Sequence, residues 1–337
     1  MIKVRFTDSW GLDLNAVLAQ HTPEGKQQWG NVLFTADPIP DADYIIILNS
    51  PPQDMKVNVS PDRLWCGIGE PGISHYRYLH NNRKEYSRVY GCDEQAAQNF
   101  KNYILSIPIL DRWKVNRSYD FLNNSDNIPE KINNLSWITS NKGKHRRRKG
   151  LKYRLDFLER IMKSNVDFDL YGKGFQFVED KWDAIAPYRY TIAFENHISN
   201  HYWSEKLTDI LVCETMPIYI GSKKITQYFP EDCMVIINPD DKYVFERIND
   251  IIHSDLREQN LAAIKTAKDL VLNKYNMLKF FSDEIEKHAA SIIPAKKTEI
   301  KIKHVSLRYP YWIYDEAVWR WPYCLFQNIR MMMRKKI

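Results

Sequence analysis

The stretch from residue 190 to residue 206 places charged side chains just after a predicted strand. In parallel β-sheets, ligands bind at this place. Residues 190–194 form an apolar run rich in β-branched and aromatic side chains, which predicts a buried strand. A polar loop at 195–201 follows, and Glu205 and Lys206 then stand near the start of a predicted helix. The N-terminus of a helix attracts anions and disfavours cations, so a lysine there indicates an anion held against it. The spacing therefore predicts a site for a phosphate-bearing ligand.

The elements around this loop are those of a strand–helix–strand unit. Residues 216–220 repeat the pattern of a buried strand, and a helix beginning near Tyr202 is predicted between the two strands. The apolar side chains of this helix recur at helical spacing, at Trp203, Leu207, Ile210 and Leu211. Such a unit belongs to a parallel sheet, which binds ligands beyond the carboxyl ends of its strands. The polar loop lies at that place.

A second loop offers another cation. The residues Tyr171-Gly172-Lys173-Gly174 end a strand predicted at 166–171, and flanking glycines allow the backbone to approach a ligand closely. Ser140 and Asn141 follow the strand predicted at 135–139 and are weaker candidates for the same ligand. Each of these residues could instead belong to a solvated loop.

Three segments, in order, resemble the signature of glycosyltransferase family 10, the α-1,3/4-fucosyltransferases. They are Ala193-Phe194-Glu195-Asn196, Tyr202-Trp203-Ser204-Glu205-Lys206 and Pro217-Ile218-Tyr219-Ile220-Gly221-Ser222. The resemblance covers the C-terminal half of the chain well and the N-terminal half loosely. It implies an α/β fold of GT-B architecture, in which two Rossmann-like domains face each other across a cleft. It also implies an inverting, metal-independent transfer of L-fucose from GDP-L-fucose to a glycan or glycolipid hydroxyl, with no cofactor.

The resemblance implies roles for individual residues of the second domain. The donor-binding residues are Lys173, Asn196, Tyr202, Glu205 and Lys206, with Ser140, Asn141 and Glu195 as weaker candidates. Lys206 would supply charge to the leaving diphosphate, and Glu195 would hold the loop in place rather than react. Lys173 stands where the family has arginine, so it offers a point charge in place of a bidentate fork.

Glu70 is the candidate general base. It lies in the turn Gly69-Glu70-Pro71-Gly72 after a predicted strand of the first domain, and the family places its base in a comparable Gly-Glu turn. A carboxylate that removes the proton of the acceptor hydroxyl contributes about 10²–10⁴-fold to the rate. Asp8 and Asp93 are alternative bases, and Glu70 could also be a purely structural turn carboxylate.

The remaining sequence predicts two α/β domains and a tail. At 337 residues the chain can bury two cores. Residues 1–125 are the predicted N-terminal acceptor-binding domain and residues 126–290 the nucleotide-sugar-binding domain. The stretch 107–134, rich in Asn, Asp and Pro, is predicted to link them. The basic, aromatic-rich tail at 291–337 is expected to pack on the first domain or to lie on an anionic membrane surface.

Composition restricts the partners and the compartment. The net charge of +6 is modest for this length, so no nucleic-acid partner is expected. The chain opens on a predicted strand rather than a signal peptide and holds no run of about 18 apolar residues. The five cysteines are scattered without paired spacing, which predicts reduced, buried thiols. We therefore expect a cytoplasmic protein of surface-polysaccharide or lipid-linked glycan synthesis, with peripheral attachment to the inner face of the cell membrane as an alternative.

Weaker patterns leave other hypotheses open. Asp41-Ala42-Asp43 and Asp167-Phe168-Asp169 match the DxD of manganese-dependent transferases, a pattern that is common by chance. His197 and His201 have the i,i+4 spacing of a zinc pair but no third ligand. The basic run 144–149 and the tail together could form a non-catalytic module for nucleic acid or anionic membranes. A transferase for a different nucleotide sugar is a further alternative, because nothing local identifies fucose.

Overall fold

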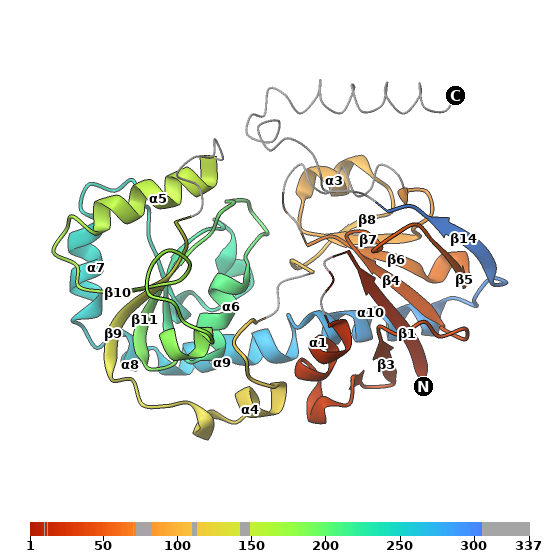
Figure 1. Cartoon of the computed structure of the whole chain (residues 1–337), viewed down its shortest axis with the longest axis horizontal. Helices are drawn as coiled ribbons and strands as arrows, with labels where there is room; N and C mark the ends of the chain where they lie inside the picture. The colour runs from red at the N-terminus through yellow and green to blue at the C-terminus, as the bar shows by residue number, and fades with distance from the viewer. Residues whose placement is uncertain are drawn as a thin grey trace.

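The computed structural model describes residues 1–9, 11, 13–69, 71, 82–109, 113–141 and 149–304. The described chain forms two lobes that lie side by side, each built on one β-sheet with helices packed against it (Figure 1). The predicted α/β fold of GT-B architecture is confirmed.

The sheet of the first lobe has the strand order β2-β3-β1-β4-β6-β7-β8. All neighbouring strands are parallel except β2 and β3. All five residues of the central strand β4 are buried, which explains its continuous apolar sequence. The strands are β1 (Ile2–Asp8), β2 (Gln28–Trp29), β3 (Val32–Thr35), β4 (Tyr44–Leu48), β6 (Leu64–Gly67), β7 (Arg88–Gly91) and β8 (Tyr103–Leu105).

The sheet of the second lobe is parallel throughout, in the order β10-β9-β11-β12-β13. Its strands are β9 (Asn133–Ile138), β10 (Asp169–Tyr171), β11 (Tyr188–Phe194), β12 (Met216–Ile220) and β13 (Val235–Ile236). Helix α6 (Glu205–Val212) connects β11 to its parallel neighbour β12, so the predicted strand–helix–strand unit is present. The helix begins at Glu205 rather than near Tyr202, because the Ser204 side chain caps it by accepting the Lys206 N–H.

The other helices cover the faces of the two sheets (Figure 1). They are α1 (Leu14–Gln20), α3 (Glu94–Asn99), α4 (Tyr119–Asn123), α5 (Lys149–Ile161), α7 (Val244–Ile252), α8 (Leu256–Gln259), α9 (Leu261–Asn273) and α10 (Met277–Ser291). Helix α5 is amphipathic, with Leu155, Leu158 and Ile161 buried against the second sheet.

Helix α10 returns to the first lobe, although its residues fall almost entirely in the range predicted for the second domain. The ring of Phe281 lies 5.5 Å from that of Phe6 and 5.6 Å from that of Tyr90. The Ser282 hydroxyl donates to the Trp29 carbonyl at 2.8 Å. The helix therefore completes the core beneath the first sheet, where Figure 1 shows it in blue.

The start of the predicted tail also lies on the first lobe. Strand β14 (Thr298–Ile302) pairs antiparallel with β5 (Met55–Val59), which the sequence analysis did not predict. Residues 305–337 lie outside the described residues, and the expectation about an anionic membrane falls on them.

The connection between the lobes is packed rather than free. Ile109, Trp113 and Val115 are each at most 1% exposed, within the stretch predicted to be the linker. The buried Asp209 carboxylate of α6 accepts hydrogen bonds from the backbone N–H groups of Lys114 and Val115. The crossing segment is thus anchored to the second lobe in the middle of α6.

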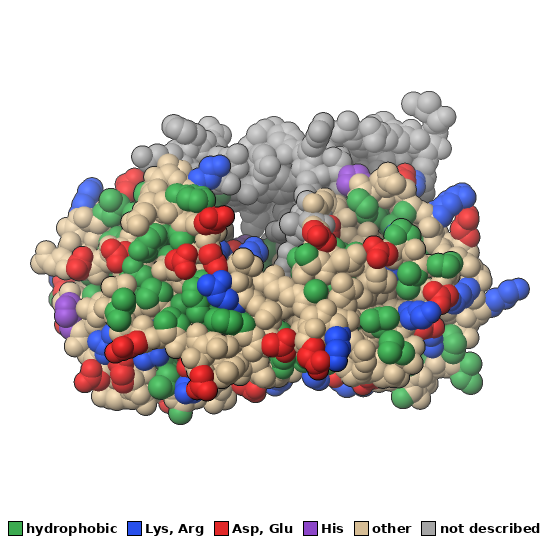
Figure 2. Space-filling model, turned by 60° about the horizontal axis from the view of Figure 1, so that its bottom comes forward, with side chains coloured by type: hydrophobic (Ala, Val, Ile, Leu, Met, Phe, Trp, Pro, Cys, Tyr) green, Lys and Arg blue, Asp and Glu red, His purple; other side chains and the backbone are tan. Residues whose placement is uncertain are grey.

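The surface and the cysteines bear on the remaining expectations. On the face drawn in Figure 2, side chains of both charges are interspersed over the two lobes. Four cysteines of the described chain are buried thiols: Cys66, Cys92, Cys213 and Cys233. Among the described residues, no helix has the length and apolar character needed to cross a membrane.

Candidate functional site

A cavity of about 300 Å³ lies at the carboxyl ends of β9, β10 and β11, beside the first turn of α6. Its lining brings together five of the residues predicted from the sequence: Ser140, Lys173, Asn196, Glu205 and Lys206. These residues come from four separate segments of the chain. The cavity is at the edge where parallel sheets bind ligands.

The first turn of α6 is fixed by a buried carboxylate. Glu195 at the end of β11 is 2% exposed and accepts hydrogen bonds from the Ser204 N–H at 2.8 Å and the Ser204 hydroxyl at 2.7 Å. Burial raises the pKa of Glu195 above its ordinary value, although the Lys206 ammonium lies 3.7 Å away. Glu195 therefore ties the loop to the helix start and is not itself part of the cavity lining.

Lys206 and Glu205 form a charged pair at the cavity wall. Lys206 Nζ donates to the Ser204 hydroxyl at 2.8 Å and lies 3.5 Å from Glu205 Oε1. Burial tends to raise the pKa of Glu205, but the ammonium groups of Lys206, Lys114 and Lys181 outweigh it and hold that pKa below its ordinary value. Burial tends to lower the pKa of Lys206, and Glu195 and Glu205 raise it above its ordinary value. Both side chains are therefore charged at neutral pH.

Arg154 of α5 lines the same cavity and was missed by the sequence analysis. Its side chain donates from Nη1 to Asn196 Oδ1 at 2.7 Å and from Nη2 to the Ser140 carbonyl at 3.2 Å. Its Nε atom is buried without a hydrogen-bond partner, as is the Thr139 hydroxyl on the cavity wall. Buried polar atoms are rarely left unpaired, so these two indicate a ligand that completes their hydrogen bonding.

A signal for Arg154 was present in the sequence. Arg154 lies three residues after Leu151 and four before Leu158, on the apolar face of the predicted helix. Arginine is almost never fully buried unless it is paired, and here it is 4% exposed. A lone arginine on a buried helical face therefore marks a polar site beneath that face.

The loop after β10 needs glycine at two positions, because its backbone packs closely against the end of β9. Gly172 and Gly174 have φ values of +114° and +92°, which side chains other than glycine rarely adopt. A Cβ on Gly172 would lie 2.0 Å from the Thr139 carbonyl oxygen, and one on Gly174 would lie 2.1 Å from Asn141 Nδ2. The loop thus lies against the end of β9, with Asn141 packed behind it and Lys173 at the cavity.

A third lysine of the cavity lining is paired with a buried carboxylate. Lys181 lines the cavity and donates to the Asp209 carboxylate at 2.6 Å. Asp209 also holds the crossing segment, and Lys114 of that segment lies 3.3 Å from Glu205. The wall of the cavity is therefore braced by the connection between the lobes.

The charges of the lining decide which ligand it suits. The lining holds four cationic side chains, Arg154, Lys173, Lys181 and Lys206, and two carboxylates, Glu205 and Asp209. This leaves an excess of two positive charges, beside the N-terminal amides of α6. That combination matches a diphosphate.

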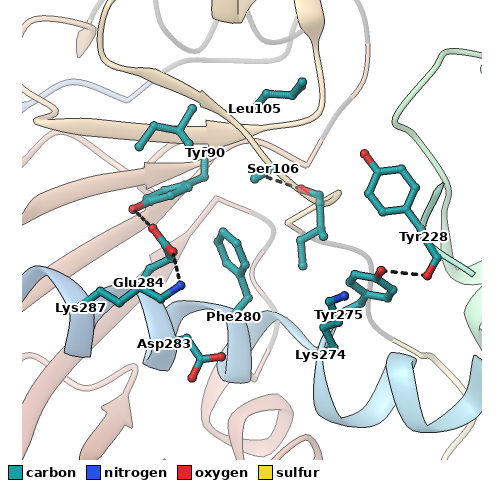
Figure 3. A pocket seen from close by; sticks show the side chains of 12 residues that line it. Tyr90, Leu105, Ser106, Tyr228, Lys274, Tyr275, Phe280, Asp283, Glu284 and Lys287 are labelled. Carbon is teal, nitrogen blue, oxygen red and sulfur yellow. Dashed lines mark hydrogen bonds and ion pairs between the residues drawn. The ribbon is translucent and has the colours of Figure 1, made fainter. Parts of the chain in front are cut away.

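A second cavity, of about 420 Å³, lies at the junction of the lobes, between Tyr90 and Tyr228 (Figure 3). Its charged side chains are Lys274, Asp283, Glu284 and Lys287, which balance. Glu284 accepts a hydrogen bond from the Tyr90 hydroxyl at 3.1 Å and another from Lys287 at 3.3 Å. This cavity has no surplus of positive charge, so it is less suited to a diphosphate than the first.

Tyr202 and Asp93 are described predicted residues that are not part of the lining of the first cavity. Tyr202 is half-buried with its ring 5.9 Å from that of His197. Glu70 lies outside the described residues; the N–H of its neighbour Gly69 donates to Asn49 Oδ1 at 3.0 Å. The alternative base Asp93 caps α3 by accepting the Ala96 N–H at 2.8 Å.

The residues of the weaker patterns have other partners. His201 contacts Glu94 and Tyr228 rather than forming a pair with His197. Asp41 pairs with Lys3, and Asp169 accepts from the Tyr188 hydroxyl at 2.6 Å. In the described ranges no group of three or more His, Cys, Asp or Glu is placed to hold a metal ion. Most of the basic run 144–149 lies outside these ranges.

The fold and this cavity define a two-domain α/β protein of GT-B architecture with a cationic cavity in its second domain. Residues 128–251 match the family model described as glycosyltransferase family 10 (fucosyltransferase), C-terminal region. The resemblance to family 10 that the sequence shows is thus confirmed for this part of the chain. The cationic residues of the cavity all lie inside the matched range.

Known proteins match this chain in part. A stretch of 81 residues is 33% identical to a fucosyltransferase-like protein of Arabidopsis thaliana, covering 23% of this chain and 16% of that protein. A crystal structure of an α1,3-fucosyltransferase is 17% identical, with a TM-score of 0.48, covering 77% of this chain and 80% of that one. An α1,3-fucosyltransferase with GDP-fucose is 18% identical, with a TM-score of 0.43, covering 82% of this chain and 90% of that one.

Proposed function

We propose that the chain is an inverting, metal-independent glycosyltransferase that moves L-fucose from GDP-L-fucose to a hydroxyl of a glycan or glycolipid. One observation carries the proposal: the cavity of the family 10 domain combines a surplus of two positive charges with the unpaired Arg154 Nε. A nucleoside diphosphate supplies the negative charge and the acceptor oxygens that this cavity lacks.

In this proposal the diphosphate lies between α5 and the start of α6. Arg154, Lys173 and Lys206 surround it with charge, and the positive end of the α6 dipole adds to that charge. Glu205 lies at the same wall as a charged carboxylate and would accept hydrogen bonds from hydroxyl groups of the donor. The side chains thus supply the positive charge that a metal ion supplies in some other transferases.

The transfer is a single displacement. The acceptor oxygen forms a bond to the anomeric carbon of fucose as the bond from that carbon to the β-phosphate oxygen breaks. The leaving GDP keeps the bonding electrons, and its new charge is stabilised by Arg154, Lys173 and Lys206. A carboxylate of the first lobe, which we assign to Glu70, takes the proton of the acceptor hydroxyl.

A thermal-shift series with GDP, UDP, CDP and dTDP tests the donor. We expect GDP to raise the Tm most, since a ligand at 100 times its Kd adds about 2.7 kcal/mol of stability. Arg154→Ala and Lys206→Ala should lose this shift. A UDP-specific shift would instead support a transferase for another sugar, and no shift with any of the four would contradict the proposal.

A transfer assay with a panel of nucleotide sugars tests the reaction. Glu205→Ala and Lys206→Ala should nearly abolish fucose transfer while the unliganded Tm changes little. Transfer should persist in EDTA, and loss of activity in the chelator, restored by Mn²⁺, would replace the metal-independent mechanism with a metal-dependent one. Analysis of the anomeric linkage of the product distinguishes inversion from retention.

A further inference from the structure

A single carboxylate of the first lobe accepts hydrogen bonds from three side chains of the second lobe. Glu94, the first residue of α3, accepts hydrogen bonds from Lys224 Nζ at 2.7 Å, Asn200 Nδ2 at 2.8 Å and His201 Nε2 at 2.7 Å. Its neighbour Asp93 caps α3 through the Ala96 N–H, so Glu94 is not needed as the cap. The Glu94 carboxylate therefore serves the contact between the lobes.

The partners of Glu94 belong to the loops that build the donor cavity. Asn200 and His201 lie between Asn196, which lines the cavity, and Ser204, which caps α6. The Ser222 hydroxyl, two residues before Lys224, donates to the Asn200 carbonyl. The loops after β11 and β12 are thus joined to each other and, through Glu94, to the first lobe.

The other side of the contact, helix α3, belongs to the part of the first sheet formed by β6 and β7. Helix α3 follows β7, and β7 pairs with β6, which leads to Gly69 and Glu70. The Ile68 N–H donates to the Tyr90 carbonyl at 2.7 Å, so this pairing extends beyond the end of β6. Glu94 therefore connects the loop after β11 with helix α3, which follows β7, the neighbour of the strand that precedes Glu70 in the chain.

The electrostatics favour a charged, bonded Glu94. The hydrogen bond from Lys224, followed by those from Asn200 and His201, lowers the pKa of Glu94 to about 2. His201 Nδ1 faces the Tyr228 hydroxyl, and the Tyr228 carbonyl accepts a hydrogen bond from the Tyr275 hydroxyl at 2.8 Å (Figure 3). The cluster is therefore continuous with the aromatic junction between the lobes.

We propose that Glu94 is a positioning residue that sets the distance between the acceptor lobe and the donor cavity by accepting hydrogen bonds from Asn200, His201 and Lys224 at the contact between the lobes. The proposal rests on the proposed function in one respect: the distance matters for chemistry only if base and donor lie on opposite lobes. A misplacement of about 1 Å between reacting groups can reduce a rate by about 100-fold. Loss of Glu94 should therefore slow transfer without weakening the binding of GDP.

The first experiment measures the separation of the two lobes and does not depend on enzymatic activity. Small-angle X-ray scattering of wild type, Glu94→Gln and Glu94→Ala should show an increased radius of gyration in both variants. The matched control is Glu258→Gln, which removes a carboxylate paired with Arg189 inside the second lobe. An unchanged radius of gyration in both Glu94 variants, with the wild-type Tm retained, would overturn the proposal.

The second experiment separates positioning from a local structural role. Transfer kcat should fall by up to about 100-fold in Glu94→Gln, while the Kd of GDP measured by calorimetry stays at the wild-type value. A loss of GDP affinity equal to the loss of rate would show that Glu94 only shapes the donor loop, and would overturn the proposal. Lys224→Gln should add little to Glu94→Gln, because both remove the same contact.

The two proposals fail in different ways. If the wild-type protein transferred no sugar and bound no GDP, the proposed function would be wrong. The scattering experiment would still show whether Glu94 holds the two lobes together. If transfer were normal and the Glu94 variants were as compact and as fast as wild type, only the positioning role would fall.

Discussion

Arg154 shows how one side chain can define a binding site. Two of its nitrogens are bonded to Asn196 and Ser140, which fixes the plane of the guanidinium, and the third nitrogen is left for a ligand. Burial lowers the pKa of Arg154, because the protein interior disfavours the charged guanidinium. A fixed fork of donors recognises a phosphate more specifically than a flexible ammonium does.

Replacing this guanidinium tests that argument. Arg154→Lys keeps the charge but loses the hydrogen bonds to Asn196 and Ser140, each worth about 1.5–3 kcal/mol when one partner is charged. We expect transfer to fall by about 10- to 100-fold, since 1.4 kcal/mol corresponds to a factor of ten. Initial rates and the Kd of GDP measure the loss. The control is Arg160→Lys on the same helix, where the side chain bonds the Pro239 carbonyl outside the cavity.

Gly172 offers a test of the loop that carries Lys173. Gly172→Ala would strain a residue at φ +114° and place a Cβ 2.0 Å from the Thr139 carbonyl oxygen. We expect a loss of stability of about 1–3 kcal/mol in urea unfolding, and a loss of GDP affinity as the loop shifts. Gly25→Ala is the control, because its φ of +63° is also positive but no atom lies closer than 3.8 Å to the added Cβ. Equal effects of the two substitutions would argue against close packing as the cause.

At the scale of elements, the sequence predicted what periodicity and local motifs can show. The unit β11–α6–β12 was predicted because its strands are apolar throughout and its helix repeats apolar residues at the right spacing. The start of α6 was placed too early, because the cap depends on Ser204 and on a hydrogen bond from Ser204 to the buried Glu195 nine residues before it. Strands β5 and β14 were missed because each is stabilised by a partner more than 200 residues away.

The same limit applies to the site. Lys206, Glu205 and Asn196 were found because they fall within one ordered motif. Arg154 and Lys181 were missed because only the fold brings α5 and the stretch before β11 to the same cavity. Long-range pairing of this kind leaves no pattern of its own in the sequence, apart from an arginine on an apolar helical face.

The contact between α8 and β11 gives a prediction about pH. The Arg189 hydrogen bond lowers the pKa of Glu258 to about 2, from an ordinary value of 4.5. A carboxylate whose folded pKa is depressed contributes stability above its unfolded pKa, and that contribution is lost as the pH falls from about 4.5 towards 2. Glu258 is 43% exposed, so solvent screens the pair and the contribution stays below about 1 kcal/mol.

Thermal unfolding of wild type and Glu258→Gln across a pH series measures this contribution. We expect the wild type to have the higher Tm at pH 7 and the difference to shrink as the pH falls below about 4.5. A difference that grew at low pH would show that the Arg189–Glu258 pair is not its source.

At the scale of the whole molecule, the first lobe is completed by a distant part of the chain. Phe281 of α10 is fully buried against Phe6 and Tyr90, and the hydroxyl of Tyr44 bonds His288 Nδ1 at 2.8 Å. The sheet of the first lobe would otherwise expose an apolar face. The lobe is therefore one folding unit made of two separate segments.

Truncation of one ring tests this assignment. Phe281→Ala should cost about 3–5 kcal/mol, the usual loss for a buried phenylalanine. Hydrogen exchange should accelerate in β1 and β7 far more than in β11, because the lost contacts lie beneath the first sheet. Phe177→Ala, at a side chain that is 79% exposed, should leave both lobes unchanged. Faster exchange confined to β11 and β12 would place α10 with the second lobe instead.

The return of α10 also affects how a nascent chain matures on the ribosome. The last strand of the first sheet ends at Leu105, yet the helix that covers this sheet ends at Ser291. At about 5–20 residues per second, the uncovered sheet waits on the order of 10–40 s for its cover. The second lobe, whose strands and helices from β9 to α9 are contiguous, can fold during that wait. The first lobe is thus synthesised before the second lobe but completes its folding after it. Chaperones that bind apolar strands therefore have the longest time to bind the first lobe.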